Sequence, residues 1–392
     1  MMTDIASFPT RFFLGAGCAL AGLAPLAAPA AETPVAPSFH WQTASPRSEG
    51  FSKAKLDALC ADLAIRHTKA FLVARDDRIV YEWYAPDWNA AKPHYTASMA
   101  KAVIGGVALA AAMDRTSIRL DDLASKYIAA WRSDPVKSTI TVRELGSHTS
   151  GLGDADVDAD VNVVKLTGWM GEFWHVLPPP RDPFTIARDI VPMVAKPGAE
   201  FHYSNPGIGM MCYCITAALR DSNSPQKDIR SLLRDAVMRR IGIADDQWDC
   251  GYDKTSRVDG LPLVGAWGGA DFTARAAARL GRLMLHDGDW DGDQVLSAEA
   301  VRKTTADSGL PNAVNAGWWT NARGRVLALP RDAYWASGAG NQTLLIVPSL
   351  KLIMVRFGDG LAPEFNDPRL FRYLLAPLAR TMIHPPTPFP ES

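Results

Sequence analysis

Apolar residues recur at two different spacings along this 392-residue chain, and the two spacings separate its strands from its helices. Two short runs rich in apolar, β-branched and aromatic residues, 70–75 and 78–84, are joined by Asp76-Asp77 and predict a β-hairpin. The segment before them, from Ser52 to about His67, has the spacing of an amphipathic helix with Ser52 as its N-cap. The folded part of the chain is therefore expected to begin with a helix followed by two antiparallel strands.

The C-terminal third returns to strand-like alternation of apolar and polar residues. Its four predicted strands are residues 325–329, 334–338, 342–347 and 351–357. A final helix is expected over residues 368–383, before a Pro-rich tail. Strands near both ends of the chain predict one antiparallel sheet to which both ends contribute.

The middle of the chain reads as helical and rich in loops. An apolar helix is predicted from Thr96, as its N-cap, to about Arg115, and a second one runs through residues 203–220. Residues 153–185 are a long polar and aromatic loop, whose length is typical of a functional cover rather than of a connection.

Together these elements predict an α+β fold: an antiparallel sheet flanked by helices, with an inserted all-helical subdomain. The α/β part is expected over about residues 50–96 and 260–385, and the helical insertion over about residues 97–259. We expect a cleft between the two.

The N-terminus has the features of an export signal. Arg11 precedes an apolar run, and Ala28-Pro-Ala30 is a small-x-small cleavage pattern. The run is too short and too broken by Gly and Pro to span a membrane, so we expect a signal peptide over residues 1–30 and a single periplasmic or secreted domain over residues 31–392 without a transmembrane segment. Cys18 leaves a lipid anchor as the alternative, although a glycine stands where such signals carry leucine.

Composition excludes several partners. Lys and Arg number 41 and Asp and Glu 42, so no global field favours nucleic acid or an anionic membrane. No His or Cys cluster has the spacing of metal ligands, and the acidic alternation from Asp154 to Asp160 lacks the glycine and the final glutamate of a calcium loop. We therefore expect neither a metal nor another cofactor.

The candidate chemistry lies in Ser98-Met-Ala-Lys101. Residues three apart share one face of a helix, so the hydroxyl and the amine are expected side by side. A serine hydroxyl needs a neighbouring base, and a desolvated lysine can act as one because burial favours its neutral form. Ser52 and Ser224 also precede a lysine by three residues, but the first is expected to cap a helix and the second to lie in a polar loop.

Three further motifs follow in order: His148-Thr-Ser-Gly-Leu152, Tyr203-Ser-Asn205 and Gly338-Ala-Gly340. With Ser98-Met-Ala-Lys101 they resemble the serine β-lactamase and penicillin-recognising superfamily over nearly all of the chain after residue 30. The pattern is most similar to the class C-like branch, which includes esterases and the 6-aminohexanoate-dimer hydrolase.

The resemblance implies a role for each matching position. Ser98 would be the acylated nucleophile, Lys101 its base or the group that keeps the base deprotonated, and Tyr203 a general base or proton relay. The oxyanion hole would consist of the backbone N–H groups of Ser98 and Ala339. Asn205 would orient a substrate amide or Lys101. His148 is expected to support the site rather than to react.

One motif departs from the family pattern. Ala336-Ser337-Gly338 stands where β-lactamases and transpeptidases carry Lys-Thr-Gly or His-x-Gly, so the cation that pairs with the carboxylate of a β-lactam is missing. We expect Ser337, Gly338 and Trp335 to bind the substrate instead. An aromatic wall is expected from Tyr334 and Trp335 together with Trp169 or Trp174.

These features favour an exported, cofactor-independent serine hydrolase that cleaves small-molecule carboxylic esters or amides through an acyl-enzyme on Ser98. A β-lactamase or D-Ala-D-Ala carboxypeptidase is the alternative within the same chemistry. A non-catalytic module that binds cell-wall fragments is the alternative from another class. The oligomeric state and the preferred acyl and leaving groups stay open.

Overall fold

The computed structural model describes residues 39–155, 166–174, 181–311, 314–360, 371–372 and 374–378. The predicted signal peptide over residues 1–30 and most of the helix predicted over residues 368–383 lie outside this part of the chain.

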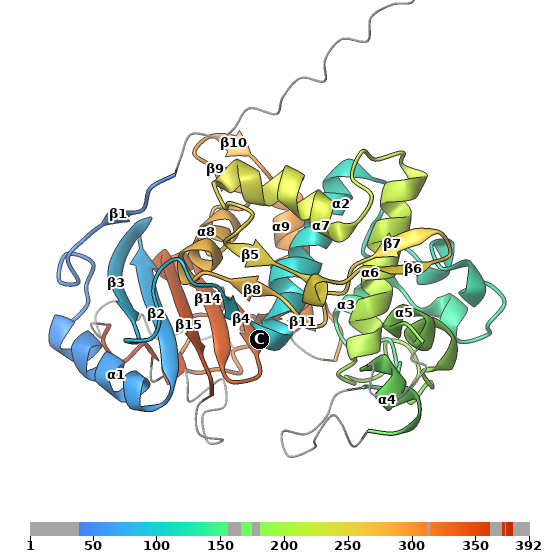
Figure 1. The fold of residues 1–392 in the computed structure, drawn as a ribbon, viewed down its shortest axis with the longest axis horizontal. Coiled ribbons are helices and arrows are strands. Elements are labelled where there is room, and N and C mark those ends of the chain that lie inside the picture. Colours follow the sequence, from blue (N-terminus) through green and yellow to red (C-terminus); the bar gives the residue numbers. More distant parts are fainter. Residues whose placement is uncertain are drawn as a thin grey trace, which may run out of the picture. The chain divides into compact units, whose positions relative to one another are not determined.

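Within the described residues, eight strands form the main sheet in the order β1-β3-β2-β15-β14-β13-β12-β11 (Figure 1). Their bounds are β1 Gln42–Thr43, β2 Thr68–Arg75, β3 Arg78–Tyr84, β11 Val314–Asn315, β12 Trp318–Thr320, β13 Tyr334–Gly338, β14 Gln342–Val347 and β15 Leu352–Gly358. Neighbouring strands are antiparallel, except that β1 runs parallel to β3. Strands from the two ends of the chain meet in the β2–β15 pair, which confirms the predicted fold class.

One of the four predicted C-terminal strands is wrong. Residues 325–329 lie in turns, because Asn321 donates through Nδ2 to the carbonyls of Val326 and Leu329 and closes the segment on itself. The sheet continues instead through β11 and β12, two short strands that the alternation does not reveal. A strand of two or three residues is too short to show a period, so the sequence pattern does not detect it.

The two faces of the sheet bury different cores. In β15, Ile353 and Val355 belong to one core, whereas Leu352 and Met354 belong to the other, as expected when successive side chains alternate between faces. Helix α1 (Lys53–Ile65) buries Leu56, Leu59 and Leu63 in the second core, and helix α8 (Ala274–Leu285) packs on the first. Each face is therefore covered by a helix.

The predicted helix at residues 96–115 is present but begins differently. A 3₁₀ turn, η1 (Ala97–Met99), is followed by a π-type segment, η2 (Lys101–Gly106), and by helix α2 (Val107–Arg115). Thr96 does not cap it, because its hydroxyl donates to the carbonyl of Ala270. The stretch Ala97–Arg115 is long and apolar enough to cross a membrane, but 83% of its most apolar window is buried, as in a core helix.

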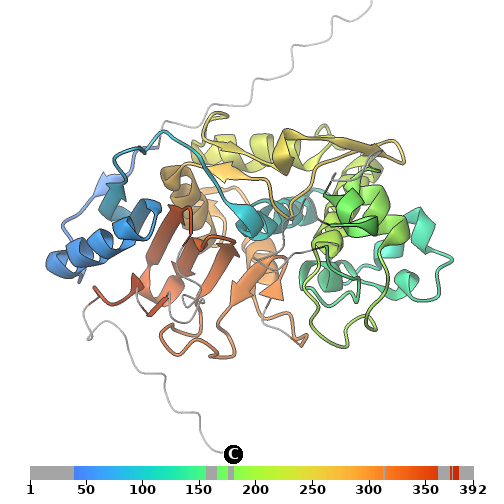
Figure 2. The ribbon, with the colours of Figure 1, turned by 60° about the horizontal axis from the view of Figure 1, so that its bottom comes forward.

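The remaining helices and short strands precede and follow this core helix in the sequence (Figures 1 and 2). They are β4 His94–Tyr95, α3 Val142–Gly146, α4 Gly168–Phe173, α5 Pro183–Thr185, α6 Asn205–Asp221, α7 Ile229–Leu233, β5 Trp248–Asp249, β6 Ser256–Val258, β7 Leu261–Leu263, β8 Asp271–Phe272, β9 Asp289–Trp290, β10 Asp293–Gln294 and α9 Ala298–Thr305. Helix α6 is buried along nearly its whole length, and Ser204 caps its start by accepting from the backbone N–H of Gly207. The end of β13 and the start of α6 both approach the Ser98 turn.

The four cysteines in the described part of the chain are free thiols. All are buried; they are Cys60, Cys212, Cys214 and Cys250. Burial raises the pKa of Cys60 to about 11 and that of Cys212 and Cys250 to about 12. The neighbouring pair Cys212 and Cys214 thus behaves as small core residues, as the apolar sequence around it indicates.

Two adjacent glycines allow a test of how tightly the core helix packs. A Cβ on Gly106 would lie 2.4 Å from the carbonyl oxygen of Ala316, whereas one on Gly105 would meet the flexible end of Met211 at 3.0 Å. We expect Gly106→Ala to lower the free energy of unfolding by about 1–3 kcal/mol more than Gly105→Ala does. Urea denaturation of the two variants measures the difference, and equal midpoints would contradict the packing described here.

Candidate active site

Ser98 lies at a tight junction between η1 and the end of β13. Ala97, directly before it, has a φ of 47°, which is uncommon for a residue with a side chain. A Cβ on Gly338 would lie 2.2 Å from the carbonyl oxygen of Thr96 and 3.1 Å from the backbone nitrogen of Ser98. Only glycine permits this approach, and it brings Ala339, the next residue, close to the serine turn.

The predicted pairing of Ser98 with Lys101 is present. Lys101 Nζ donates to Ser98 Oγ at 2.9 Å and to the backbone carbonyl of Trp267 at 2.6 Å. The lysine residue is only 2% exposed, so its amine is held by protein groups rather than by bulk water. Trp267 is a part of the site that the sequence does not reveal, because it contributes a main-chain oxygen.

Tyr203 stands over the same amine. Lys101 Nζ lies 4.7 Å from the centre of the Tyr203 ring, and that ring stacks on His148 with 4.4 Å between the ring centres. The predicted members of the proton-transfer group, Ser98, Lys101 and Tyr203, are thereby brought together from η1, η2 and the residue pair before α6.

His148 supports this group from below the tyrosine ring. Its Nδ1 accepts from the backbone N–H of Ser204 at 3.1 Å, which puts the ring proton on Nε2. Burial, and then the positive charge of Lys101, lower the pKa of His148 to about 3, so the imidazole is neutral near pH 7. A neutral ring whose Nδ1 is already occupied fits the supporting role expected for it.

Asn205 is fixed by a residue that the sequence analysis did not assign to the site. Its backbone N–H and its side-chain Nδ2 both donate to Asp154 Oδ1, at 2.9 and 3.3 Å. Asp154 therefore sets the direction of the Asn205 amide. The acidic alternation from Asp154 to Asp160 does not by itself indicate this role, and residues 156–160 of it lie outside the described residues.

Trp335 does not lie where the aromatic wall was expected. It is 4% exposed and packs edge-on against Phe371 in the core beneath α1, on the opposite face of β13 from Tyr334 and Ala336. Tyr334 is also buried, against Trp318, with 5.6 Å between the ring centres. Neither ring is available for contact with a substrate, whereas Ser337 and Gly338 are partly exposed at the end of the strand.

The turn after β13 is held by two buried side chains. Arg356 is fully buried in β15 and donates to the carbonyls of Gly340 and Asn341, and burial lowers its pKa to about 10. Gln342 donates to the carbonyls of Ala339, at 3.2 Å, and Gly358, at 2.6 Å. These contacts fix the backbone around Ala339, whose N–H is the second predicted oxyanion donor.

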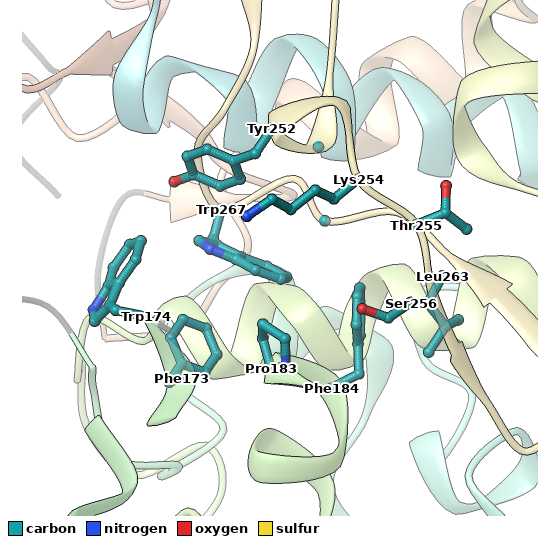
Figure 3. A pocket seen from close by; sticks show the side chains of 12 residues that line it. Phe173, Trp174, Pro183, Phe184, Tyr252, Lys254, Thr255, Ser256, Leu263 and Trp267 are labelled. Atoms are coloured by element: carbon teal, nitrogen blue, oxygen red, sulfur yellow. The ribbon is translucent and has the colours of Figure 1, made fainter. Parts of the chain in front are cut away.

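Two cavities border these residues. One, of about 390 Å³, is lined by aromatic side chains and shares the ring of Trp267, whose carbonyl holds Lys101 (Figure 3). Trp174, which is one of the residues predicted for the aromatic wall, lines this cavity, whereas Trp169 packs against the first core. The other cavity, of about 630 Å³, is more open and is lined by Tyr95 and Ala339 among others. The described residues contain no group of three or more His, Cys, Asp or Glu side chains able to hold a metal.

The model of the family described as Beta-lactamase matches residues 56–378 of this chain. The chain belongs to the β-lactamase family. It is accordingly an enzyme, a serine hydrolase, and the match includes every strand of the main sheet except β1, as well as the core helix and the segment that contains Tyr203.

Solved structures share the fold at low sequence identity. A protein of Bacillus anthracis assigned as a candidate 6-aminohexanoate-dimer hydrolase is 20% identical, with a TM-score of 0.65 over 86% of this chain and 87% of its own. A family VIII carboxylesterase is 16% identical, with a TM-score of 0.61 over 86% and 98%. A class C β-lactamase is 14% identical, with a TM-score of 0.56 over 83% and 96%. The predicted resemblance is thus confirmed for the family and for the fold.

The neutral state of His148 gives the stability of the fold a pH dependence. The histidine in the unfolded chain takes up its proton near pH 6.5, whereas in the fold it does so only near pH 3. The contribution of neutral His148 to the free energy of unfolding is therefore fully present above pH 6.5. It decreases as the pH is lowered towards 3, by up to about 1.4 kcal/mol per pH unit. We expect His148→Gln, which keeps an acceptor but does not titrate, to show a smaller loss of stability between pH 7 and pH 5.

Urea denaturation at the two pH values measures this loss. His67→Gln, at an exposed position, is the matched control and should keep the slope of the unmodified protein. An unchanged slope in His148→Gln would show that His148 does not contribute to the pH dependence.

Proposed function

We propose that this protein is an exported hydrolase that cleaves carboxylic esters or amides of small molecules through an acyl-enzyme on Ser98. The observation that carries the proposal is the 2.9 Å contact between Lys101 Nζ and Ser98 Oγ, in a chain of the β-lactamase family. The relatives named as an esterase and as a candidate amide hydrolase support this substrate class as an analogy. Export rests on the signal peptide predicted for residues 1–30.

In the proposed reaction, Ser98 Oγ attacks the carbonyl carbon of the substrate while its proton passes to the group formed by Lys101 and Tyr203. The negative charge that develops on the carbonyl oxygen is stabilised by the N–H groups of Ser98 and Ala339, each worth about 3 kcal/mol in such sites. The tetrahedral intermediate then collapses and the bond to the leaving group breaks. The Lys101–Tyr203 group transfers the proton that it took from Ser98 to the leaving group. A water molecule hydrolyses the acyl-serine by the reverse sequence, which releases the acid and restores the Ser98 hydroxyl.

Two alternatives share part of this evidence. A β-lactamase or D-Ala-D-Ala carboxypeptidase would use the same serine, but Ala336 stands where such enzymes carry a cation for the substrate carboxylate. A covalent penicillin adduct on Ser98, detected by mass spectrometry, would favour that alternative. A non-catalytic binding module is disfavoured because it would have no chemical reason to hold Ser98, Lys101 and Tyr203 in contact.

The first test uses p-nitrophenyl butyrate. We expect a burst of p-nitrophenol stoichiometric with the protein, followed by steady turnover, and a loss of at least about a thousandfold in turnover for Ser98→Ala. Ser224 also precedes a lysine by three residues and, unlike Ser52, does not cap a helix. The Ser224→Ala protein is therefore the control and should keep the burst. Equal rates in Ser98→Ala and the unmodified protein would rule out an acyl-enzyme on this residue.

A second test addresses the approach of β13 to the serine. Gly338→Ala places a methyl group against Thr96 and Ser98, so the strand end must move and Ala339 N–H must leave the oxyanion position. We expect turnover to fall by about a hundredfold or more. Gly153→Ala, where the added methyl meets its nearest neighbours at 3.3–3.5 Å, should change turnover little. Unaltered turnover in a folded Gly338→Ala protein would contradict the proposed oxyanion hole.

A further inference from the structure

The cavity beside Trp267 is a partly open aromatic site with one charged side chain (Figure 3). Its rings come from α4, from α5 and from the two segments that flank β6 and β7; they are Phe173, Trp174, Phe184, Tyr252 and Trp267. Phe173 and Phe184 lie 5.1 and 5.3 Å from Trp267 between ring centres. A volume of about 390 Å³ is within the range of small-molecule sites.

This cavity is adjacent to the reacting group. Trp267 contributes its ring to the cavity wall and its carbonyl oxygen to Lys101, so one residue separates the cavity from the Ser98–Lys101 pair. The indole Nε1 of Trp267 is buried and has no hydrogen-bond partner among the described residues. The aromatic compartment and the Ser98–Lys101 pair thus share Trp267.

Lys254 gives the compartment a positive charge. It is the one charged side chain among the described residues that line the cavity, and Figure 3 shows its amine directed into the cavity towards Tyr252 and Trp267. No ion pair joins it to a carboxylate in the described part of the chain. The open cavity beside Ala339 differs, because Asp271 and Asp359 line it. Asp359 is paired with Lys69, so the two compartments differ in the charged side chains that line them.

The loop that carries Lys254 is held in place from both sides. Arg230 donates to the carbonyl of Cys250 at 2.7 Å and to Thr255 Oγ1 at 3.3 Å. Tyr252 adopts a left-handed conformation, with a φ of 55°, that lays its ring on Gly269, where a Cβ would come within 2.3 Å of the ring. Such a backbone persists only where its surroundings determine it. The loop therefore presents Lys254 from a fixed base.

We propose that this cavity binds an aromatic group of the substrate that carries a carboxylate, and that Lys254 pairs with that carboxylate. The inference rests on the proposed function, since it names the substrate class of the same site. The rings supply apolar area and edge-to-face contacts for an aryl group. The ammonium group of Lys254 then supplies, from the helical side of the site, the cation that is absent at Ala336.

Binding is tested in Ser98→Ala protein with cinnamate and its neutral analogue cinnamamide, followed by the quenching of tryptophan fluorescence. We expect Lys254→Gln to raise the Kd of cinnamate about tenfold and to leave that of cinnamamide within about twofold. Arg257→Gln removes the same charge from an exposed residue of β6 that does not line the cavity, and it should change neither Kd. An equal Kd for cinnamate with and without Lys254, or no binding of cinnamate at millimolar concentration, would overturn the proposal.

Kinetics then tell on which side of the scissile bond the aryl carboxylate lies. One pair of esters, p-nitrophenyl hydrogen terephthalate and p-nitrophenyl p-toluate, varies the acyl group; the other, the acetate esters of p-hydroxybenzoate and p-cresol, varies the leaving group. We expect Lys254→Gln to reduce kcat/KM for the charged member of one pair about tenfold relative to its neutral partner. Equal effects on both members of both pairs would overturn the proposal.

The binding arm is independent of acyl transfer. Selective binding of cinnamate through Lys254 would stand even if Ser98 proved not to be acylated. Conversely, a burst that depends on Ser98 would stand if Lys254 proved irrelevant. The failure of one proposal is thus distinguishable from the failure of the other.

Discussion

The contact of Lys101 Nζ with Ser98 Oγ and the Trp267 carbonyl is the interaction on which the site depends. A buried amine is stable only where polar atoms replace the water it has lost, so both acceptors must be in position before the lysine can be. One acceptor comes from the same helical turn, whereas the other comes from a loop 166 residues later in the chain. A single side chain therefore links the nucleophile to the loop that carries the Trp267 ring.

A second constraint is the absence of a side chain. Gly338 lets β13 approach the turn of Ser98 until their backbones touch, and Arg356 and Gln342 fix the turn beyond it from the interior of the sheet. The two predicted oxyanion donors thus belong to elements that are far apart in sequence but rigidly joined in the fold. Preorganised N–H groups of this kind need no reorganisation as charge develops, which is why a rigid sheet edge suits the task.

The pairing of Ser98 with Lys101 was predictable because three residues of helical sequence decide it. The face of Trp335 was not, because a strand pattern shows which residues alternate but not which side meets the site. The acceptor on Trp267 was equally hidden, since every residue has a carbonyl and only the fold selects one. The predicted strand at residues 325–329 failed for a different reason: the Asn321 side chain closes those residues into turns, and this local hydrogen bonding outweighs their apolar alternation.

The buried thiols have a practical consequence for following this protein in solution. Cys60, Cys212, Cys214 and Cys250 are shielded from reagents, and burial raises the pKa of each thiol, which keeps all four protonated near neutral pH. A thiol reagent can therefore reach them only when the chain opens. Their rate of labelling therefore measures local and global opening. Cys60 reports on the opening of α1, and Cys212 and Cys214 report on the opening of the helical core around α6.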